Sequence, residues 1–211
     1  MLRDRLKELI ASEELAPGKL IVDFGCGNMP YRSLFQDKFG EYLGADLRGN
    51  AQADLIIDAD GRISVQNESV DCVLSTQVLE HAEDPASYLN EAARVLVPDG
   101  SLILSTHGIW KYHPAPSDYW RWTKDGLVMQ IERAGFEVLH VAGVFGLLAS
   151  SLQLLQDGLM PSLPKWSRRL AIMFIQPLIG LVERGKTRQV RNDASVYVVL
   201  ARKANAAREP E

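Results

Sequence analysis

The sequence predicts an α/β fold: a doubly wound, mostly parallel seven-stranded sheet with a helical insertion before the last strand. Two observations support this prediction. Short apolar runs alternate with segments of helical periodicity, which is typical of buried parallel strands joined by crossover helices. Residues 144–190 interrupt that alternation with long apolar stretches that match no strand–helix unit. We therefore expect a single domain over residues 1–211 that carries an apolar helical insertion.

Seven apolar runs bounded by turn residues are the predicted strands. They cover residues 19–24, 42–45, 53–57, 70–75, 101–106, 136–141 and 195–201. Residues 1–16 contain an amphipathic N-terminal helix, and the polar segment 204–211 is expected to be a disordered tail.

Two further helices carry start and stop signals. Asp84 is a predicted N-cap followed by Pro85 in the first turn, where proline is tolerated, and this helix continues to about Leu96. Thr123 opens a second helix, which stops at Gly135.

Composition narrows the function classes. A formal net charge of −4 argues against a nucleic-acid partner, which normally requires a basic stripe. Cys26 and Cys72 are too few for a disulfide framework or a metal knuckle, so we expect buried free thiols and no metal. The N-terminus lacks the apolar core of a signal peptide, and the longest apolar run, 170–182, is too short to span a bilayer. A cytoplasmic protein is expected.

The sharpest motif follows the first predicted strand. Asp23 ends that strand, and Gly25, Cys26 and Gly27 form a Gly-x-Gly turn in which the backbone can bend tightly and approach a ligand. A dinucleotide fingerprint requires a third small residue where Pro30 stands, so a nicotinamide or flavin site is disfavoured. Taken alone, the motif is also compatible with a structural strand-to-helix turn.

Two more acids follow at ends of predicted strands. Asp46 lies about twenty residues after the glycine turn, a spacing at which a carboxylate can accept the hydroxyls of a ribose. A solvated loop aspartate is the alternative. Asp58 ends the third strand and could accept the exocyclic amine of an adenine, although Asp60 is only two residues away.

These elements together resemble the class I S-adenosylmethionine-dependent methyltransferases, in the type 11 methyltransferase domain subgroup. The resemblance covers roughly residues 18–141 and the final strand, and it implies a Rossmann-like sheet whose last strand is antiparallel. The matching segments occur in the family's order at 22–27, 46, 58–59, 69–75, 78–81, 84–85 and 91–100.

The resemblance implies S-adenosylmethionine as cofactor. It places Asp23 and the turn Gly25-Cys26-Gly27 at the methionine end, with Gln77 beside it. It also places Asp46 at the ribose, and Asp58 with Ala59 at the adenine. This chain departs from the usual pattern at residues 28–30, after the glycine turn, and at residues 60–66. The second departure leaves Asp58 and Asp60 as alternatives at the adenine.

The segment 106–123, after the fifth strand, is dense in residues that move protons or stack on a substrate. His113 is the first candidate for a general base, since imidazole titrates near neutral pH. Asp118 is its expected orienting partner or a substrate ligand. His107, Tyr119 and Arg121 are further substrate-binding candidates. The alternatives are a loop packed by its aromatic residues and a local ion pair between Asp118 and Arg121.

His81 follows the fourth strand, and a structural hydrogen bond is favoured for it. In some quinone O-methyltransferases this region carries an acidic pair and a histidine connected with metal. Gln77 replaces the earlier acid in this chain, so no metal is expected.

Two apolar stretches in the insertion, 145–160 and 166–182, flank a basic and aromatic cluster at 165–169. Such clusters occur at bilayer interfaces. Two uses stay open: a cover or homodimer surface, which is favoured, or peripheral contact with the inner membrane surface.

The function expected is methyl transfer to a small-molecule or lipid- or glycan-linked acceptor, with O-methylation favoured. An inactive methyltransferase-fold module for binding or scaffolding is the alternative. Intact Asp23, Asp46 and the glycine turn favour the enzyme, because a degenerate relative would be expected to lose at least one of these elements.

Overall fold

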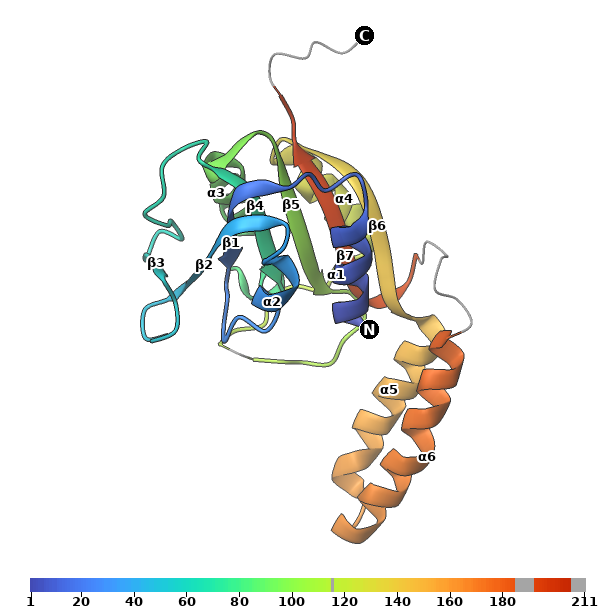
Figure 1. The fold of residues 1–211 in the computed structure, drawn as a ribbon. Helices are drawn as coiled ribbons and strands as arrows, with labels where there is room; N and C mark the ends of the chain where they lie inside the picture. Colours follow the sequence, from blue (N-terminus) through green and yellow to red (C-terminus); the bar gives the residue numbers. More distant parts are fainter. Residues whose placement is uncertain (115, 185–191, 206–211) are drawn as a thin grey trace.

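The computed structural model describes residues 1–114, 116–184 and 192–205. Its centre is a sheet of seven strands in the order β3-β2-β1-β4-β5-β7-β6 (Figure 1). All neighbouring strands are parallel except β7, which is antiparallel to both β5 and β6. This confirms the predicted fold class. The strands are β1 (Gly18–Phe24), β2 (Phe39–Leu47), β3 (Leu55–Ile57), β4 (Val70–Thr76), β5 (Leu96–His107), β6 (Phe136–Gly146) and β7 (Ala194–Lys203).

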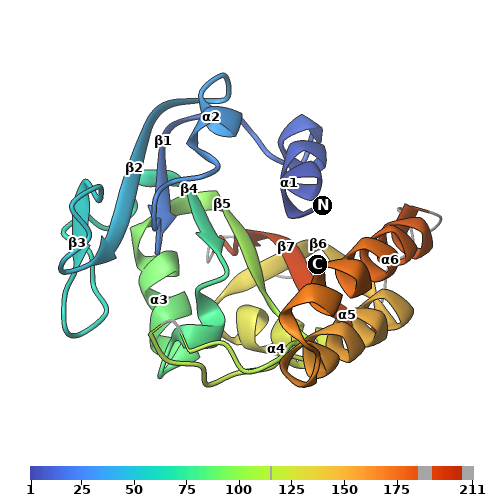
Figure 2. The same ribbon diagram turned by 90° about the horizontal axis from the view of Figure 1, so that it is seen from below.

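Helices cover both faces of the sheet, as a doubly wound fold requires (Figure 2). Two lie on one face and two on the other, and a helical pair follows β6. The helices are α1 (Leu2–Ala11), α2 (Arg32–Phe35), α3 (Pro85–Val95), α4 (Lys124–Arg133), α5 (Leu147–Leu159) and α6 (Lys165–Arg184), with short 3₁₀ turns at Leu79–His81 and Met160–Ser162.

The caps predicted from the sequence are confirmed. The Asp84 carboxylate accepts hydrogen bonds from the backbone N–H groups of Ala86 (3.0 Å) and Ser87 (3.3 Å). The Thr123 hydroxyl accepts from the Gly126 N–H at 3.1 Å. Both bonds satisfy donors that the first helical turn leaves free.

Several strands extend beyond the apolar runs that predicted them. β2 begins at Phe39 instead of residue 42, because the backbone at Gly18–Leu20 pairs with residues 39–41 whatever their side chains. β3 is shorter than predicted. Asp54 lies outside it, and its carboxylate accepts the Gly44 N–H at 2.9 Å. β6 continues to Gly146, so the helices of the insertion begin at Leu147.

The core has two layers, one on each face of the sheet. Leu89 of α3 and Leu127 of α4 pack on one layer, and Leu6 of α1 and Phe35 of α2 pack on the other. Cys26 and Cys72 are both buried and free, as predicted. Residues 206–211 of the predicted tail lie outside the described part of the chain.

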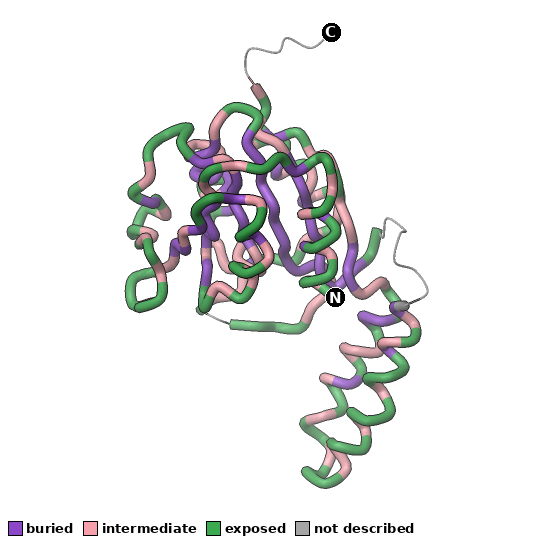
Figure 3. The backbone as a smooth tube through the Cα atoms, viewed as in Figure 1, coloured by how far each residue is buried: buried purple, intermediate pink, exposed green. Residues whose placement is uncertain are grey.

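The helices α5 and α6 form an antiparallel pair that projects from the end of β6 (Figures 1 and 3). We call this pair, residues 147–184, the arm. Its base is held by Glu183, whose carboxylate accepts the N–H groups of Phe145 (3.0 Å) and Gly146 (3.4 Å). Among the described residues, no helix is long and apolar enough to cross a membrane.

Candidate cofactor and acceptor site

The sheet order sets a topological switch point between β1 and β4, where doubly wound sheets form their ligand crevice. From β1 the chain adds β2 and β3 toward one edge of the sheet, and it then returns to add β4 on the other side of β1. The order in which strands are added therefore reverses between β1 and β4. In doubly wound sheets, ligands bind at the carboxyl ends of the strands beside such a reversal. Asp23, Asp46 and Gln77 all lie at this edge, at or directly after the ends of β1, β2 and β4.

The glycine turn after β1 needs glycine at both positions. Gly25 and Gly27 have φ values of 86° and 52°, in the left-handed region that side chains disfavour. A Cβ on Gly25 would lie 2.4 Å from a methyl carbon of Val78, so the turn can approach the segment after β4 only without a side chain. A Cβ on Gly27 would meet nothing within 4 Å, which leaves open space beside the turn.

Asp23 is fully buried and only partly satisfied. Its Oδ2 accepts a hydrogen bond from the Tyr42 hydroxyl at 2.6 Å. Its Oδ1 is buried and has no hydrogen-bond partner among the described residues. Burial raises the pKa of the Asp23 carboxyl to about 6, although the Tyr42 hydrogen bond works in the opposite direction. A buried oxygen with no partner is costly unless a ligand supplies a donor.

Asp46 is attached directly to the glycine turn. Its Oδ2 accepts the Gly27 N–H at 2.9 Å and the Asn50 side-chain amide at 2.7 Å. The same Asn50 amide donates to the Gly27 carbonyl at 2.7 Å, which closes a small network. Asn50 was not among the predicted site residues. The available signal was its position in the Gly49-Asn50 turn directly after β2.

Asp58 and Asp60 differ in their surroundings. Asp58 Oδ1 accepts the N–H groups of Asp60 (3.0 Å) and Arg62 (2.8 Å), so this oxygen already closes the turn after β3. Asp60 and Ala59 are exposed within that turn. Both carboxylates therefore remain alternatives at this end of the crevice.

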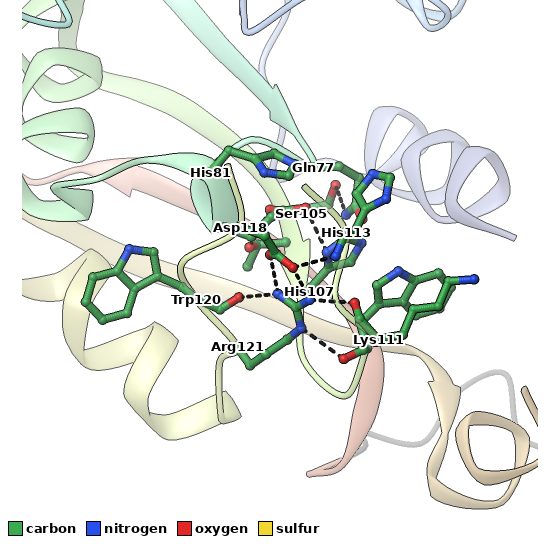
Figure 4. Close-up of polar contacts among 12 residues, drawn as sticks. Gln77, His81, Ser105, His107, Lys111, His113, Asp118, Trp120 and Arg121 are labelled. Atoms are coloured by element: carbon green, nitrogen blue, oxygen red, sulfur yellow. Dashed lines mark hydrogen bonds and ion pairs between the residues drawn. The ribbon is translucent and has the colours of Figure 1, made fainter. Parts of the chain in front are cut away.

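Gln77 connects the ends of β4 and β5 (Figure 4). Its φ is 58°, and its side-chain amide donates to the Ser105 hydroxyl at 3.1 Å, while its backbone N–H donates to the Ser105 carbonyl at 2.8 Å. One N–H of the amide is thus used, and its second N–H and the side-chain oxygen remain available to a ligand.

Arg121 organises the segment 108–123, which we call the acceptor loop. Its guanidinium uses all five N–H donors within that loop (Figure 4). Two, one on Nη1 and one on Nη2, bind the two oxygens of the Asp118 carboxylate end-on at 2.6 Å each. The other three bind the carbonyls of Trp110 (3.0 Å), Lys111 (2.6 Å) and Trp120 (2.8 Å). Arg121 therefore holds the loop, and it has no donor left for a substrate.

Asp118 serves the same network. Hydrogen bonds from Arg121 are the main reason that the pKa of the Asp118 carboxyl falls to about 2. Its Oδ2 also accepts the backbone N–H of His113 at 2.6 Å. The carboxylate thus holds the His113 backbone, whereas the sequence led us to expect either orientation of the imidazole ring or contact with the substrate.

Three histidines meet above the ends of β4 and β5. The ring of His113 lies 5.8 Å from that of His81 and 6.0 Å from that of His107. His113 is exposed, whereas His81 donates its Nδ1 hydrogen to the Ser117 carbonyl, the structural bond favoured from the sequence. The acceptor loop therefore leaves one of the three rings, His113, open to solvent.

His107 lies beneath the other two rings. Its side chain is buried, stacks on Trp110 at 5.2 Å and lies 3.1 Å from the carboxylate of Glu80. Burial, aided by the nearby Arg121 cation, lowers the pKa of His107 to about 4, so the ring is neutral at pH 7. Burial also raises the pKa of Glu80, which accepts the Thr106 hydroxyl at 2.8 Å. Across the described residues, no three ligands of the His, Cys, Asp and Glu types gather as a metal site.

Comparison with known proteins finds a methyltransferase domain in the part of the chain that contains the glycine turn, Asp46 and Gln77. Residues 22–104 match a methyltransferase domain family. A protein named as a probable S-adenosylmethionine-dependent methyltransferase from Mycolicibacterium smegmatis is 28% identical over 143 residues, 61% of this chain and 56% of that protein. A ubiquinone biosynthesis O-methyltransferase from Dinoroseobacter shibae is 30% identical over 135 residues, 56% of this chain and 50% of that protein.

The chain thus spans about half the length of these curated relatives. Among solved structures, a chain from the complex of the Haloferax volcanii Trm112 methyltransferase activator with a methyltransferase has a TM-score of 0.62 and 20% identity, and the match covers 97% of this chain and 92% of that one. Such low identity shows the fold alone. The sheet order is that of the class I methyltransferase fold, and residues 22–104 match a methyltransferase domain, which confirms the resemblance seen in the sequence.

Proposed function

We propose that this protein transfers a methyl group from S-adenosylmethionine to a nucleophilic atom, favoured to be oxygen, of a small-molecule acceptor. The observation that carries the proposal is the hydrogen bonding of two carboxylates that lie at the same strand ends. Asp23 keeps a buried oxygen without a protein partner, and Asp46 is held against the glycine turn. A ligand with donors for both fits this arrangement.

The residues present fit the cofactor of this family. Asp23 Oδ1 would accept a donor from the methionine end, beside the Gly25-Cys26-Gly27 turn, and Gln77 would lie next to it. Asp46 would accept the ribose hydroxyls, because each carboxylate oxygen can take more than one hydrogen bond. Asp58 with Ala59, or Asp60, would meet the adenine. The bound cofactor supplies an activated methyl group on its sulfonium, so the protein has to position and deprotonate the acceptor.

The acceptor loop would carry the second half of the reaction. His113 is the candidate base, since its ring is exposed at the edge where the crevice opens. Arg121 and Asp118 would act as positioning residues, because they hold the backbone on both sides of that ring. Tyr119, 52% exposed, remains a candidate for substrate contact. A hydroxyl acceptor needs such a base, and the O-methyltransferase relative supports this choice.

Calorimetry with S-adenosylhomocysteine tests the cofactor half directly. Asp46→Ala removes two charge-assisted hydrogen bonds to the ribose, each worth about 1.5–3 kcal/mol, so the affinity should fall by about 100-fold or more. Asp37→Ala, which alters an exposed acid outside the crevice, is the matched control and should bind like the parent.

Parent-like affinity in a folded Asp46→Ala protein would refute the assignment, and so would saturable micromolar binding of NADH. Tight binding of S-adenosylhomocysteine without transfer to any hydroxyl, amine or thiol acceptor would instead favour a binding module.

A further inference from the structure

The arm carries most of the exposed apolar surface of the described chain. Eleven of the eighteen large hydrophobic residues that are exposed lie on its two helices. They are Leu147, Leu148, Leu155, Leu159, Trp166, Leu170, Ile172, Met173, Phe174, Leu178 and Leu181. Figure 3 shows the same feature, a projecting pair of helices with little buried backbone. Contiguous apolar surface of this kind marks an interaction site.

The exposed residues follow helical spacing. Trp166, Leu170, Met173 and Leu181 recur every three, four or eight residues along α6 and therefore share one outward face. Leu148, Leu155 and Leu159 do the same on α5. Each helix thus has an apolar stripe that its partner helix does not cover.

Polar side chains lie where the two helices meet. The Gln176 amide donates to the side-chain oxygens of Gln153 (3.2 Å) and Gln156 (3.1 Å), and Gln156 is buried. Ala149 and Ile179 are buried in the arm as well, so small, apolar and amide side chains lie inside while most of the large apolar ones face outward. An apolar exterior of this kind is what an interfacial helix presents to a bilayer.

The tip of the arm is positively charged. Between residues 158 and 182 the sequence has three cations, Lys165, Arg168 and Arg169, and no acid. They lie in the first turns of α6, where cations oppose the helix dipole. Trp166, 73% exposed, lies among them. Cations at the start of a helix destabilise it, so an anionic partner that offsets their charge would fit this position. The amphipathic indole ring of Trp166 fits a partner with a polar and an apolar layer, such as a bilayer interface.

We propose that the arm docks on the surface of an anionic lipid bilayer. Lys165 and Arg169 meet the headgroups, and Trp166, Phe174 and Leu181 enter the boundary between headgroups and acyl chains. Charge complementarity favours anionic lipid over a second copy of the chain, whose arm would bring the same cations.

Docking also bears on the acceptor, and this step rests on the proposed function. The Lys111 ammonium, in the acceptor loop, lies 3.3 Å from the Asp157 carboxylate near the end of α5. The arm and the acceptor loop are thereby connected. A bilayer under the arm would place that loop near the headgroup layer, so the proposed acceptor class is an amphiphile that carries its nucleophile on a polar head.

Co-sedimentation with vesicles tests the docking. The full chain should bind vesicles of equal parts phosphatidylcholine and phosphatidylglycerol, bind phosphatidylcholine alone far less, and be partly released by salt. The double variant Lys165→Glu and Arg169→Glu should lower the affinity by about tenfold or more, because each cation contributes near an anionic surface. Phe174→Ser with Leu181→Ser should lower it similarly.

Matched controls alter exposed residues of α4: Arg133→Glu for charge and Met129→Ser for apolar area. Both should bind vesicles like the parent. Absence of binding to the anionic vesicles, or equal loss in the α4 controls, would overturn the proposal. So would a mass in sedimentation velocity that rises with concentration and falls in the Phe174→Ser, Leu181→Ser variant, since that result indicates a dimer.

Calorimetry on the same variants separates the two proposals. The arm variants should bind S-adenosylhomocysteine like the parent, and vesicle binding is measured without cofactor. Failure of either measurement therefore leaves the other interpretable. Methylation of a fully water-soluble acceptor at a rate unchanged by anionic vesicles, with no methylation of detergent-dispersed lipid acceptors, would reject the acceptor class alone.

Discussion

The two halves of the crevice are built differently. On the cofactor side, Asp23 is buried with one carboxylate oxygen unpaired. On the acceptor side, Arg121 donates five hydrogen bonds inside its own loop, two of them to Asp118 and three to backbone carbonyls. The unpaired oxygen of Asp23 is a buried acceptor that a ligand could satisfy. The guanidinium of Arg121 has no such capacity left, so we infer that it positions other groups.

This difference assigns different consequences to similar substitutions. Removing a scaffold residue should disturb catalysis while the cofactor still binds. Removing the buried carboxylate proposed to bind the cofactor should weaken cofactor binding and stabilise the protein without cofactor. Three substitutions, taken from the largest expected effect to the smallest, can confirm or break this contrast.

Arg121→Met tests the scaffold. It removes five hydrogen bonds and leaves the Asp118 carboxylate unpaired, so the acceptor loop should lose its geometry. Turnover should fall by about 10²- to 10³-fold, because misplacement of about 1 Å costs about 10²-fold. Affinity for S-adenosylhomocysteine should stay within about twofold of the parent. Arg121→Lys should not rescue turnover, since lysine lacks the planar fork. An Arg121→Met enzyme with parent-like turnover would show that the acceptor loop keeps its geometry without the hydrogen bonds of Arg121.

His113→Ala tests the group that the scaffold presents. Loss of a general base should lower turnover by about 10²-fold with cofactor affinity unchanged. The backbone bond from His113 to Asp118 survives, so the loop should remain in place. His140→Ala, on exposed β6, is the control. Full activity in the His113 variant would move the base to His81 or His107, or indicate that none is used.

Asp23→Asn tests the cofactor side through pH-dependent stability. Burial raises the pKa of Asp23 from 3.8 to about 6. Ionisation of Asp23 therefore lowers the free energy of unfolding as the pH rises through this range. The amide avoids that cost. The variant, without cofactor, should therefore be more stable by about 3 kcal/mol at pH 8, and the gain should shrink toward pH 5. Urea unfolding at the two pH values measures this.

The Asp23→Asn variant should also bind S-adenosylhomocysteine more weakly than the parent, since an amide is a poorer acceptor than a carboxylate. A variant that is destabilised at pH 8, or whose gain is independent of pH, would contradict the interpretation of Asp23 as a ligand-binding carboxylate.

Local signals predicted the secondary structure well. The caps Asp84 and Thr123, the glycine turn and the seven apolar runs all depend on neighbouring residues, and the structure confirms them. Strand ends were less predictable. Residues 39–41 belong to β2 through backbone pairing with β1, which requires no apolar side chain.

Partners distant in sequence could not be predicted in the same way. The Tyr42 hydroxyl reaches Asp23 because β1 and β2 are parallel neighbours in one particular register. The spacing of Asp118 and Arg121 suggested an ion pair, but the carbonyls of Trp110 and Lys111 come within reach only when the loop folds back. These contacts changed the expected role of Arg121 from substrate ligand to scaffold.

The sequence by itself determined the fold class and the order of elements, and it singled out the carboxylates proposed to bind the cofactor, because these depend on short motifs and on periodicity. Only the tertiary structure decided which hydrogen-bonding groups were already used. It also decided the direction of the arm: apolar periodicity predicts helices, but it does not say whether their apolar faces turn toward the sheet or away from it. In this protein those faces remain exposed, since two helices alone cannot cover one another.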